Sequence, residues 1–503
     1  MNYLITLDLG TTSVKTTLYD CRLSSIESNT EEYSLLTPGP DVVELEPRIY
    51  WAACVNGIQK VLKRSGIDAA AVISISISTQ GETFIPVDPD GTPLSNAIVW
   101  LDARANEEAA WLKERIGDEE YFRVTGLPEF GSANPISKLL WVKNNKPDIY
   151  EKTYKFLLLE DFIIYKLSGV FVTEPTNMSS SGYFNTRDNI VWTEGLEKAG
   201  LDPEKIPSVI DSGAIVGNIL EEAAAETGLS PGTVIIAGAN DQICSAVGTG
   251  NIAPSTISET TGTALVVVCT TDKMPDTNEY NVTVSRHCNG TFIILAYSAT
   301  SGIIYKWFKD VFCEDDVLLS EKEGLDIYDH LNTMAEKVPR GSDGLLLLPY
   351  FAGKLSPDLN EDACGTFYGV GLRHTKGHFI RAIMEGIACM LRENLEIAHK
   401  LCGESNKVIS TGGGSKSPLW NQIKADMINK ELCIATGDGS SLGAAIIGAV
   451  SNGWFGSIDE ACKSVVKISG SYQPDSEGVL EYQKLYDKYL LLYDSLMPVF
   501  RCK

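Results

Sequence analysis

Two short turns rich in glycine and threonine have the residue types that bind phosphate. Gly10-Thr11-Thr12 follows an apolar run, and Thr261-Gly262-Thr263 precedes one about half the chain further on. Backbone amides in a tight turn can hold phosphate oxygens with the help of threonine hydroxyls, and glycine lets the chain come close. A purely structural hairpin would explain either turn taken alone. Asp8 strengthens the case for the first turn, because a carboxylate just ahead of a phosphate turn can hold Mg²⁺ through water.

A third glycine-rich turn, Gly412-Gly413-Gly414, follows a short apolar run in the last fifth of the chain. No lysine and Ser/Thr pair closes it as in a Walker-type loop, and it lacks the GxGxxG spacing of dinucleotide folds. A flat glycine platform could instead stack on an adenine. An ordinary turn between a strand and a helix is the alternative.

Asp241 stands where the apolar run 234–237 gives way to small residues. A strand end that opens into a cleft is where α/β enzymes commonly place ligands and reacting groups. A carboxylate there could take a proton from a hydroxyl within hydrogen-bond reach. The alternative is that Asp241 caps the helix that follows.

The elements that must position these residues alternate between strands and helices. The sequence predicts strands at 3–7, 14–19, 72–78 and 264–268, and a helix at 47–64. Pro47 suits the first turn of that helix, and Gly66 lies just past its end. Strands interleaved with helices indicate an α/β architecture.

A chain of 503 residues is too long for one ordinary core, so we expect at least two domains with a cleft between them. The second threonine turn restarts the pattern of the first, which suggests two related halves. We therefore expect an N-terminal domain over residues 1–250 and a C-terminal domain over 251–503, with a hinge at 248–251.

The charge balance and the cysteines restrict the function classes. The chain has 42 Lys+Arg against 66 Asp+Glu, a formal charge of −24, which would repel nucleic acid and anionic membrane surfaces. Its 12 cysteines include no CxxC pair, as expected for reduced thiols. We see neither a signal segment nor an apolar run of the roughly 20 residues that span a bilayer, so a cytoplasmic protein is expected.

In this order and at these distances, the turns and Asp241 resemble the FGGY carbohydrate kinases. Residues 135–145 (PISKLLWVKNN) are similar to the first signature of that family, and residues 365–386 (GTFYGVGLRHTKGHFIRAIMEG) to its second. The resemblance covers nearly the whole chain, and Ala133 is a minor departure from the first signature. It implies an α/β, two-domain fold of the sugar kinase, actin and chaperone-ATPase type, which is ribonuclease H-like, with a cleft between the domains.

The resemblance also implies a reaction and its residues. The reaction is phosphorylation of a sugar hydroxyl by ATP, with Asp241 as general base and Asp8 holding Mg²⁺. ATP contacts would come from Gly10, Thr11, Thr12, Gly262, Thr263, Gly413, Gly414 and Asn421, with Gly443, Ala444 and Ala445 supporting the adenosine pocket. Sugar contacts would come from Gln80, Glu82, Trp100, Asp102 and Gln242. Core packing is the alternative for Trp100, and Lys138 and Trp141 are expected to be structural.

Three functions follow from these residues. The first is a kinase for a ketopentose such as D-xylulose, because Leu348-Pro349-Tyr350 and Arg373-His374-Thr375 resemble xylulokinases. The second is a kinase for glycerol, another polyol or a sugar acid, because Gln80-Gly81-Glu82-Thr83 is closer to the Gln-Arg-Glu-Thr of glycerol kinases. The third is a non-enzymatic, nucleotide-gated scaffold, against which Asp241 and the sugar residues argue. The expected partner is a small sugar or polyol and not nucleic acid or a membrane, with a homodimer as an open option.

Gly81 adds an expectation about substrate size. In glycerol kinases an arginine at this place fills space and donates to hydroxyls in a rigid fork. A glycine should leave a roomier pocket, so a five-carbon ketose or a longer polyol should be a better substrate than glycerol.

Overall fold

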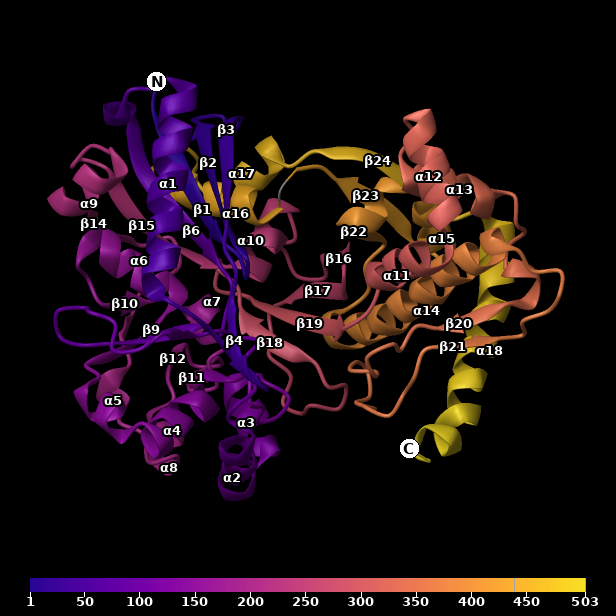
Figure 1. The fold of residues 1–503 in the computed structure, drawn as a ribbon, viewed down its shortest axis with the longest axis horizontal. Helices are drawn as coiled ribbons and strands as arrows, with labels where there is room; N and C mark the ends of the chain where they lie inside the picture. Colours follow the sequence, from indigo (N-terminus) through magenta and orange to yellow (C-terminus); the bar gives the residue numbers. More distant parts are fainter. Residues whose placement is uncertain (438, 503) are drawn as a thin grey trace.

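The computed structural model describes residues 1–437 and 439–502, which form two α/β lobes side by side (Figure 1). Each lobe is built on one large mixed sheet. The sheet of the N-terminal lobe has the order β14 (Ile215–Asn218), β15 (Val234–Asn240), β6 (Val72–Thr79), β1 (Tyr3–Leu9), β2 (Ser13–Asp20), β3 (Ser25–Glu32). The sheet of the C-terminal lobe has the order β18 (Thr283–Arg286), β19 (Phe292–Ser298), β17 (Leu265–Thr271), β16 (Ile257–Thr261), β22 (Lys407–Thr411), β23 (Glu431–Ala435), β24 (Ile468–Tyr472).

The two sheets share one topology around the predicted phosphate turns. Strands β1 and β2 form an antiparallel hairpin, and β1 also pairs in parallel with β6. In the other lobe β16 and β17 form the hairpin, and β16 pairs in parallel with β22. Next in each sheet, β15 pairs in parallel with β6, and β23 pairs in parallel with β22. An antiparallel strand then forms the edge of each sheet, β14 beside β15 and β24 beside β23. This correspondence supports the internal repeat expected from the sequence.

The predicted first helix is confirmed as α1 (Pro47–Ser65). Pro47 occupies its first turn, where a missing N–H costs nothing. Gly66 adopts φ 66° and donates its N–H to the carbonyl of Leu62, which ends the helix in the left-handed conformation that glycine favours.

Strand β6 is covered on both faces, although its alternating sequence resembles that of a half-exposed strand. Ile75 and Ile77 are fully buried in the main core of the N-terminal lobe. Ser74 and Ser76 point the other way and are also fully buried, against the helix α16 (Gly439–Ser451). Small serine side chains let that helix approach the sheet closely.

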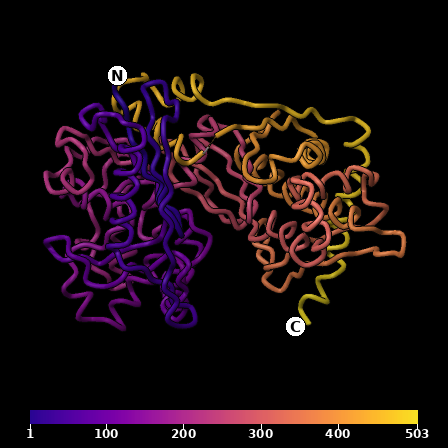
Figure 2. The backbone as a smooth tube through the Cα atoms, turned by 45° about the horizontal axis from the view of Figure 1, so that its top comes forward, coloured from indigo at the N-terminus to yellow at the C-terminus, as the bar shows by residue number. Residues whose placement is uncertain are grey.

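Helix α16 and the following α17 (Ile458–Val465) come from the C-terminal part of the chain but pack on the N-terminal lobe (Figures 1 and 2). Ala445 and Ile446 of α16 share a buried cluster with Leu4 of β1 and Val247 of α10 (Asp241–Gly248). A Cβ on Gly443 would lie 1.8 Å from the carbonyl oxygen of Cys244, so only glycine allows this contact between α10 and α16. By packing, residues 439–465 therefore belong with the first lobe, whereas the expected division at 250 follows chain order.

The remaining elements surround these sheets. A second sheet of the N-terminal lobe has the order β4 (Leu36–Gly39), β5 (Val42–Leu45), β8 (Ala97–Ile98), β7 (Phe84–Val87), β9 (Lys155–Leu158). Two-stranded sheets pair β10 (Val172–Thr173) with β13 (Ser208–Val209), β11 (Phe184–Asn185) with β12 (Ile190–Val191), and β20 (Leu346–Leu348) with β21 (Thr366–Tyr368). The other helices of the first lobe are α2 (Asn106–Ile116), α3 (Asp118–Thr125), α4 (Pro135–Asn145), α5 (Pro147–Lys152), α6 (Leu159–Ser168), α7 (Pro175–Met178), α8 (Thr193–Lys198) and α9 (Glu221–Thr227).

The helices of the C-terminal lobe are α11 (Gly302–Phe312), α12 (Glu314–Glu323), α13 (Ile327–Glu336), α14 (Lys376–Cys402), α15 (Pro418–Ile428) and α18 (Ser476–Phe500). Short 3₁₀ turns lie at Ala69–Ala71, Pro203–Lys205, Ser342–Gly344 and Gly413–Lys416. In the part of the chain that the structure describes, we find no helix with the length and apolar character of a membrane span.

Candidate active site

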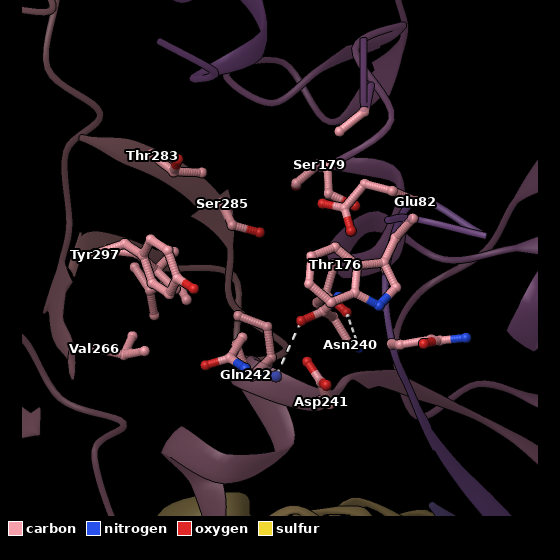
Figure 3. Close-up of a pocket in the computed structure, with 18 of the residues that line it drawn as sticks. Glu82, Thr176, Ser179, Asn240, Asp241, Gln242, Val266, Thr283, Ser285 and Tyr297 are labelled. Atoms are coloured by element: carbon pink, nitrogen blue, oxygen red, sulfur yellow. Dashed lines mark hydrogen bonds between the residues drawn. The ribbon is translucent and has the colours of Figure 1, made fainter. Parts of the chain in front are cut away.

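A cavity of about 430 Å³ lies between the two lobes, with a wall from each (Figure 3). The wall from the N-terminal lobe has mostly polar side chains and consists of Thr11, Gln80, Gly81, Glu82, Trp100, Ala133, Asn134, Thr176, Ser179, Ser180, Asn240, Asp241, Gln242 and Ile243. The opposite wall comes from β17, β18 and β19 and consists of Val266, Thr283, Ser285, Ile293, Leu295 and Tyr297. Four of the five predicted sugar-binding residues and the predicted base therefore line one cavity.

Asp241 is the first residue of α10 and directly follows β15. The helix is capped by its neighbour Asn240, whose side-chain oxygen accepts a hydrogen bond from the N–H of Gln242 at 3.0 Å. The alternative that Asp241 is the capping residue is therefore wrong. Burial, followed by the negative charges of Asp8 and Glu82, raises the pKa of the Asp241 carboxyl to about 7. A carboxyl with this pKa can accept a proton near neutral pH.

Glu82 follows the end of β6 in a conformation that is uncommon for a residue with a side chain. Its φ is 57°, in the left-handed region, which costs free energy and is often found at functional sites. Burial raises the pKa of the Glu82 carboxyl, while the charge of Lys138 and a hydrogen bond from Ser180 lower it. The neighbouring Gln80 is buried and donates to the hydroxyl of Tyr50 at 3.3 Å.

Trp100 connects the cavity with the first phosphate turn. Its indole N–H donates to the hydroxyl of Thr11 at 2.9 Å, and its ring lines the cavity. Lys138 supports the loop from behind, because its buried ammonium donates to the carbonyl oxygens of Val99 at 2.9 Å and Trp100 at 3.2 Å. This contact fits the structural role expected for Lys138.

Asp102 is not part of the cavity wall, in contrast to the expected sugar contact. The side chain is fully buried and accepts hydrogen bonds from the N–H of Val43 at 2.6 Å and from Nε of Arg104 at 2.8 Å. Arg104 also bonds Glu44 at 2.8 Å. The guanidinium thus holds Asp102 in a buried ion pair that fixes the loop carrying Trp100.

The first predicted phosphate turn joins β1 to β2. The N–H of Gly10 donates to the carbonyl of Ser13 at 2.9 Å, which closes the turn, and the side chain of Thr12 is exposed. Asp8, two residues earlier, accepts hydrogen bonds from the hydroxyls of Ser78 and Ser440, each at 2.7 Å. Ser440 lies in the first turn of α16, so the returning helix contributes directly to this turn.

The second and third turns meet at a separate cavity of about 750 Å³ in the C-terminal lobe. Gly262, Thr263, Gly413 and Gly414 all line it. A Cβ on Gly413 would meet nothing within 4 Å, and one on Gly262 would meet only the carbonyl oxygen of Ala264 at 4.0 Å. Both glycines therefore present backbone to the open cavity, as a nucleotide site requires.

The predicted ATP contact Asn421 and the predicted supports Gly443 to Ala445 do not line this cavity. Asn421 lines a neighbouring cavity and donates to the carbonyl of Ser415 at 2.7 Å, so it braces the glycine turn from behind. Gly443 to Ala445 do not support the adenosine pocket, because α16 packs on α10 of the other lobe.

A buried ion pair beneath the second turn could not be predicted from a local motif. The ammonium of Lys424 lies 2.8 Å from Glu259, and both side chains are at most 1% exposed. Glu259 also accepts from the hydroxyl of Thr261 at 2.7 Å and from that of Ser410. The pair ties β16, β22 and α15 together where the two glycine turns of the 750 Å³ cavity begin.

Three cavity residues were not predicted from the sequence: Thr176 lies on α7, and Ser179 and Ser180 lie in the loop that follows it. A run of small polar residues, Ser179-Ser180-Ser181, was the available signal, but such runs are common in loops. Figure 3 shows Thr176 and Ser179 on the same wall as Glu82 and Asp241.

Two models of one protein family match the two halves of the chain. The model described as the N-terminal domain of the FGGY family of carbohydrate kinases matches residues 3–248, and the model of the C-terminal domain of that family matches residues 260–452. The chain belongs to the FGGY family of carbohydrate kinases. The resemblance predicted from the sequence is confirmed, and this FGGY kinase is an ATP-dependent sugar kinase.

Individual relatives of this FGGY kinase differ in substrate. A xylulose kinase of Bacillus subtilis is 28% identical over 497 residues, covering 98% of this chain and 97% of the relative. A gluconokinase of Bacillus licheniformis is 29% identical over 498 residues, covering 98% and 96%. A crystal structure of gluconate kinase from Lactobacillus acidophilus superposes with a TM-score of 0.89 at 25% identity and covers 98% of both chains. The predicted fold is confirmed, and xylulose is not distinguished from a sugar acid by these comparisons.

Proposed function

We propose that this FGGY kinase phosphorylates a neutral five-carbon sugar or polyol, a ketopentose such as D-xylulose, with Asp241 as the general base. The charge of the cavity carries the proposal. Among the described residues that line it are the carboxyl side chains of Glu82 and Asp241, and none is Lys, Arg or His. The carboxylate of a sugar acid would face like charges without a cation to pair with, which disfavours its binding.

The lining groups near Glu82 suit a polyhydroxylated substrate. A Cβ on Gly81 would lie 2.8 Å from the hydroxyl of Ser180 and 2.9 Å from the side-chain nitrogen of Asn240. These two groups occupy the space beside the glycine, so Gly81 does not simply leave an empty volume. Instead, the hydroxyl of Ser180 and the amide of Asn240 take the place of the arginine side chain expected in glycerol kinases, and both groups can form hydrogen bonds with substrate hydroxyls.

The mechanism assigns proton transfer to Asp241. A sugar hydroxyl is a poor nucleophile, and Asp241 would take its proton as the oxygen bonds to the γ-phosphate of ATP, a contribution of typically 10²–10⁴-fold. The turns at Gly10 and Gly262 would hold phosphate oxygens through backbone amides. Closure of the two walls seen in Figure 3 would exclude water, which would otherwise compete with the sugar as acceptor.

Asp8 is the residue that would hold Mg²⁺ brought in with ATP. Its carboxylate, with the hydroxyls of Ser78 and Ser440 on it, offers the oxygen ligands that this hard cation prefers. The negative charge that Asp8, Asp241 and Glu82 bring together also fits a cation. When bound, Mg²⁺ supplies neutralisation of phosphate charge.

A substrate panel tests the proposal. ADP release would be measured at saturating ATP with D-xylulose, D-ribulose, five-carbon polyols, glycerol and gluconate. We expect the highest kcat/KM for a neutral five-carbon substrate and a lower value for glycerol, which the cavity of about 430 Å³ holds loosely. A higher kcat/KM for gluconate would contradict the neutral-substrate proposal, and a best value for glycerol would favour the short polyol.

A further inference from the structure

Two buried carboxylates lie behind Asp241 and take no part in the mechanism above. Glu160 is on α6, and Glu174 immediately precedes α7. Both side chains are fully buried, and neither lines the cavity. Two buried acids close to one strand are costly unless donors satisfy them, so their hydrogen bonds show what the acids do.

Glu174 orients the hydroxyl of Thr176. It accepts hydrogen bonds from that hydroxyl at 2.7 Å and from the N–H groups of Thr176 and Asn177 at 2.8 and 2.6 Å. Both oxygens of Glu174 already accept from backbone N–H groups, and the hydroxyl of Thr176 itself accepts from another N–H, so the hydroxyl proton points to Glu174. The lone pairs of the hydroxyl then face the N–H of Asn240, which donates to it at 2.8 Å.

Glu160 orients the side chain of Asn177 in a second chain of bonds. It accepts from the side-chain amide of Asn177 at 2.5 Å and from the N–H of Gly238 at 2.7 Å. The amide oxygen of Asn177 in turn accepts from the side-chain nitrogen of Asn240 at 3.4 Å. Strand β15 shifts register against β6 between Ile236 and Ala239, so Glu160 satisfies an N–H at this irregularity.

Both chains of bonds end on Asn240, the residue directly before Asp241. Thr176 holds its backbone N–H, Asn177 holds its side-chain nitrogen, and its side-chain oxygen caps α10 at Gln242. Figure 3 shows Thr176, Asn240 and Asp241 together at the floor of the cavity, with the bond from Asn240 to Thr176 dashed.

We infer that Glu160 and Glu174 are positioning residues, which fix Asn240 through Asn177 and Thr176 and thereby aim the Asp241 carboxylate at the substrate hydroxyl. The inference rests on the proposed role of Asp241 as base. A carboxylate is needed at both positions, because the groups around Glu160 and Glu174 donate hydrogen bonds to them. A glutamine at either position would place its NH₂ group against one of these donors. The size of the side chain would stay the same, but the direction of the bonds would be lost.

The test compares Glu174→Gln, Thr176→Val and Thr176→Ser with wild type. We expect Glu174→Gln and Thr176→Val to lower kcat for sugar phosphorylation by roughly 10- to 100-fold, the order expected for misplacement of about 1 Å, with the KM for ATP unchanged. Thr176→Ser keeps the hydroxyl and should restore most of kcat. The threonine variants keep the test decisive if Glu174→Gln does not fold.

A matched control is Glu385→Gln in α14, because Glu385 is also buried and accepts hydrogen bonds from the N–H of Gly341 and the hydroxyl of Ser342. It should change thermal stability but leave kcat within a factor of about two. An equal loss of kcat in Glu385→Gln, or full kcat in both Glu174→Gln and Thr176→Val, would overturn the inference.

Asp241→Asn separates this inference from the proposed function. If Asp241→Asn is inactive while Glu174→Gln and Thr176→Val turn over normally, the positioning role is wrong and the base assignment stands. If Asp241→Asn keeps normal turnover, the base assignment is wrong and the positioning role falls with it.

Discussion

Each of the two threonine turns joins the strands of a hairpin, and the first strand of each hairpin also pairs in parallel with a third strand. The acids near the two turns, Asp8 and Glu259, have different surroundings. Asp8 of the first lobe accepts hydrogen bonds from the hydroxyls of Ser78 and Ser440 near the cleft. Glu259 of the second lobe is fully buried and paired with the ammonium of Lys424. In the proposed mechanism the hairpin sets where phosphate approaches, and the neighbouring side chains set whether the nearby acid holds a cation, as proposed for Asp8, or braces the sheet, as Glu259 does.

The largest expected effect comes from substituting Asp241, the proposed base in the first lobe. Asp241→Asn keeps the shape of the side chain but cannot accept the substrate proton, so kcat should fall by about 10²–10⁴-fold. Nucleotide affinity should remain, because the proposed nucleotide cavity lies in the other lobe. Sugar-dependent ADP release and direct ATP-binding titration measure the two effects. Turnover near that of wild type would show that Asp241 is not the base.

Glu259, the buried acid of the second lobe, should instead contribute to the stability of the fold. Lys424→Met leaves Glu259 buried without its cation, and breaking such a pair costs about 3–5 kcal/mol of the free energy of unfolding. The double variant Lys424→Met, Glu259→Leu removes both charges and should recover much of that loss. Denaturant unfolding of Lys424→Met, Glu259→Leu alone and the double variant gives the coupling free energy between the two side chains. Additive losses would mean that the pair does not act as a unit.

Gly262→Val tests the second turn without disturbing its support. A Cβ here meets only the oxygen of Ala264 at 4.0 Å, so the protein should fold, while the branched side chain enters the nucleotide cavity. ATP affinity should fall by about tenfold, or about 1.4 kcal/mol, with little change in sugar affinity. Gly414→Val is the contrasting variant, because its Cβ would lie 2.5 Å from Thr261 and should lower stability. Unchanged ATP affinity in folded Gly262→Val would contradict the phosphate role.

The smallest expected effect is a shift in pH dependence. Asp241 must be ionised to act as base, and its pKa is about 7, so kcat/KM for the sugar should fall as the pH drops below about 7. Glu82→Gln removes a negative charge that raises this pKa. The acid limb should therefore move to lower pH, by roughly one unit. A pH–rate profile of both proteins measures the midpoint, and a shift to higher pH would refute the coupling.

Local signals account for the parts of the fold and site that the sequence predicted. Pro47 and Gly66 bound α1 because helix ends depend on a few adjacent residues. Asp241 could be placed in a cleft because it follows a continuous apolar strand. The glycines at 262 and 413 share a cavity because the turns that carry them follow neighbouring strands of one sheet.

Contacts between distant segments account for the parts that could not be predicted. Asp102 is withdrawn from the cavity by Arg104, whose orientation also depends on Glu44 in another segment. The partner of Glu259 is 165 residues away, at Lys424. Thr176 matters through its bond to Asn240, and nothing near Thr176 in the sequence reveals that the two meet.

A chain cut at residue 250 would not give two self-sufficient proteins. The first fragment would keep β1 and β6 but lose the helix that covers them, and with it the fully buried Ala445 and Ile446. The second fragment would carry α16 as an apolar helix without its sheet. Each half would thus expose the surface that the other covers, and the two would fold best when expressed together as complementing fragments. A viable split site has to leave residues 439–465 able to reach Leu4 and Val247.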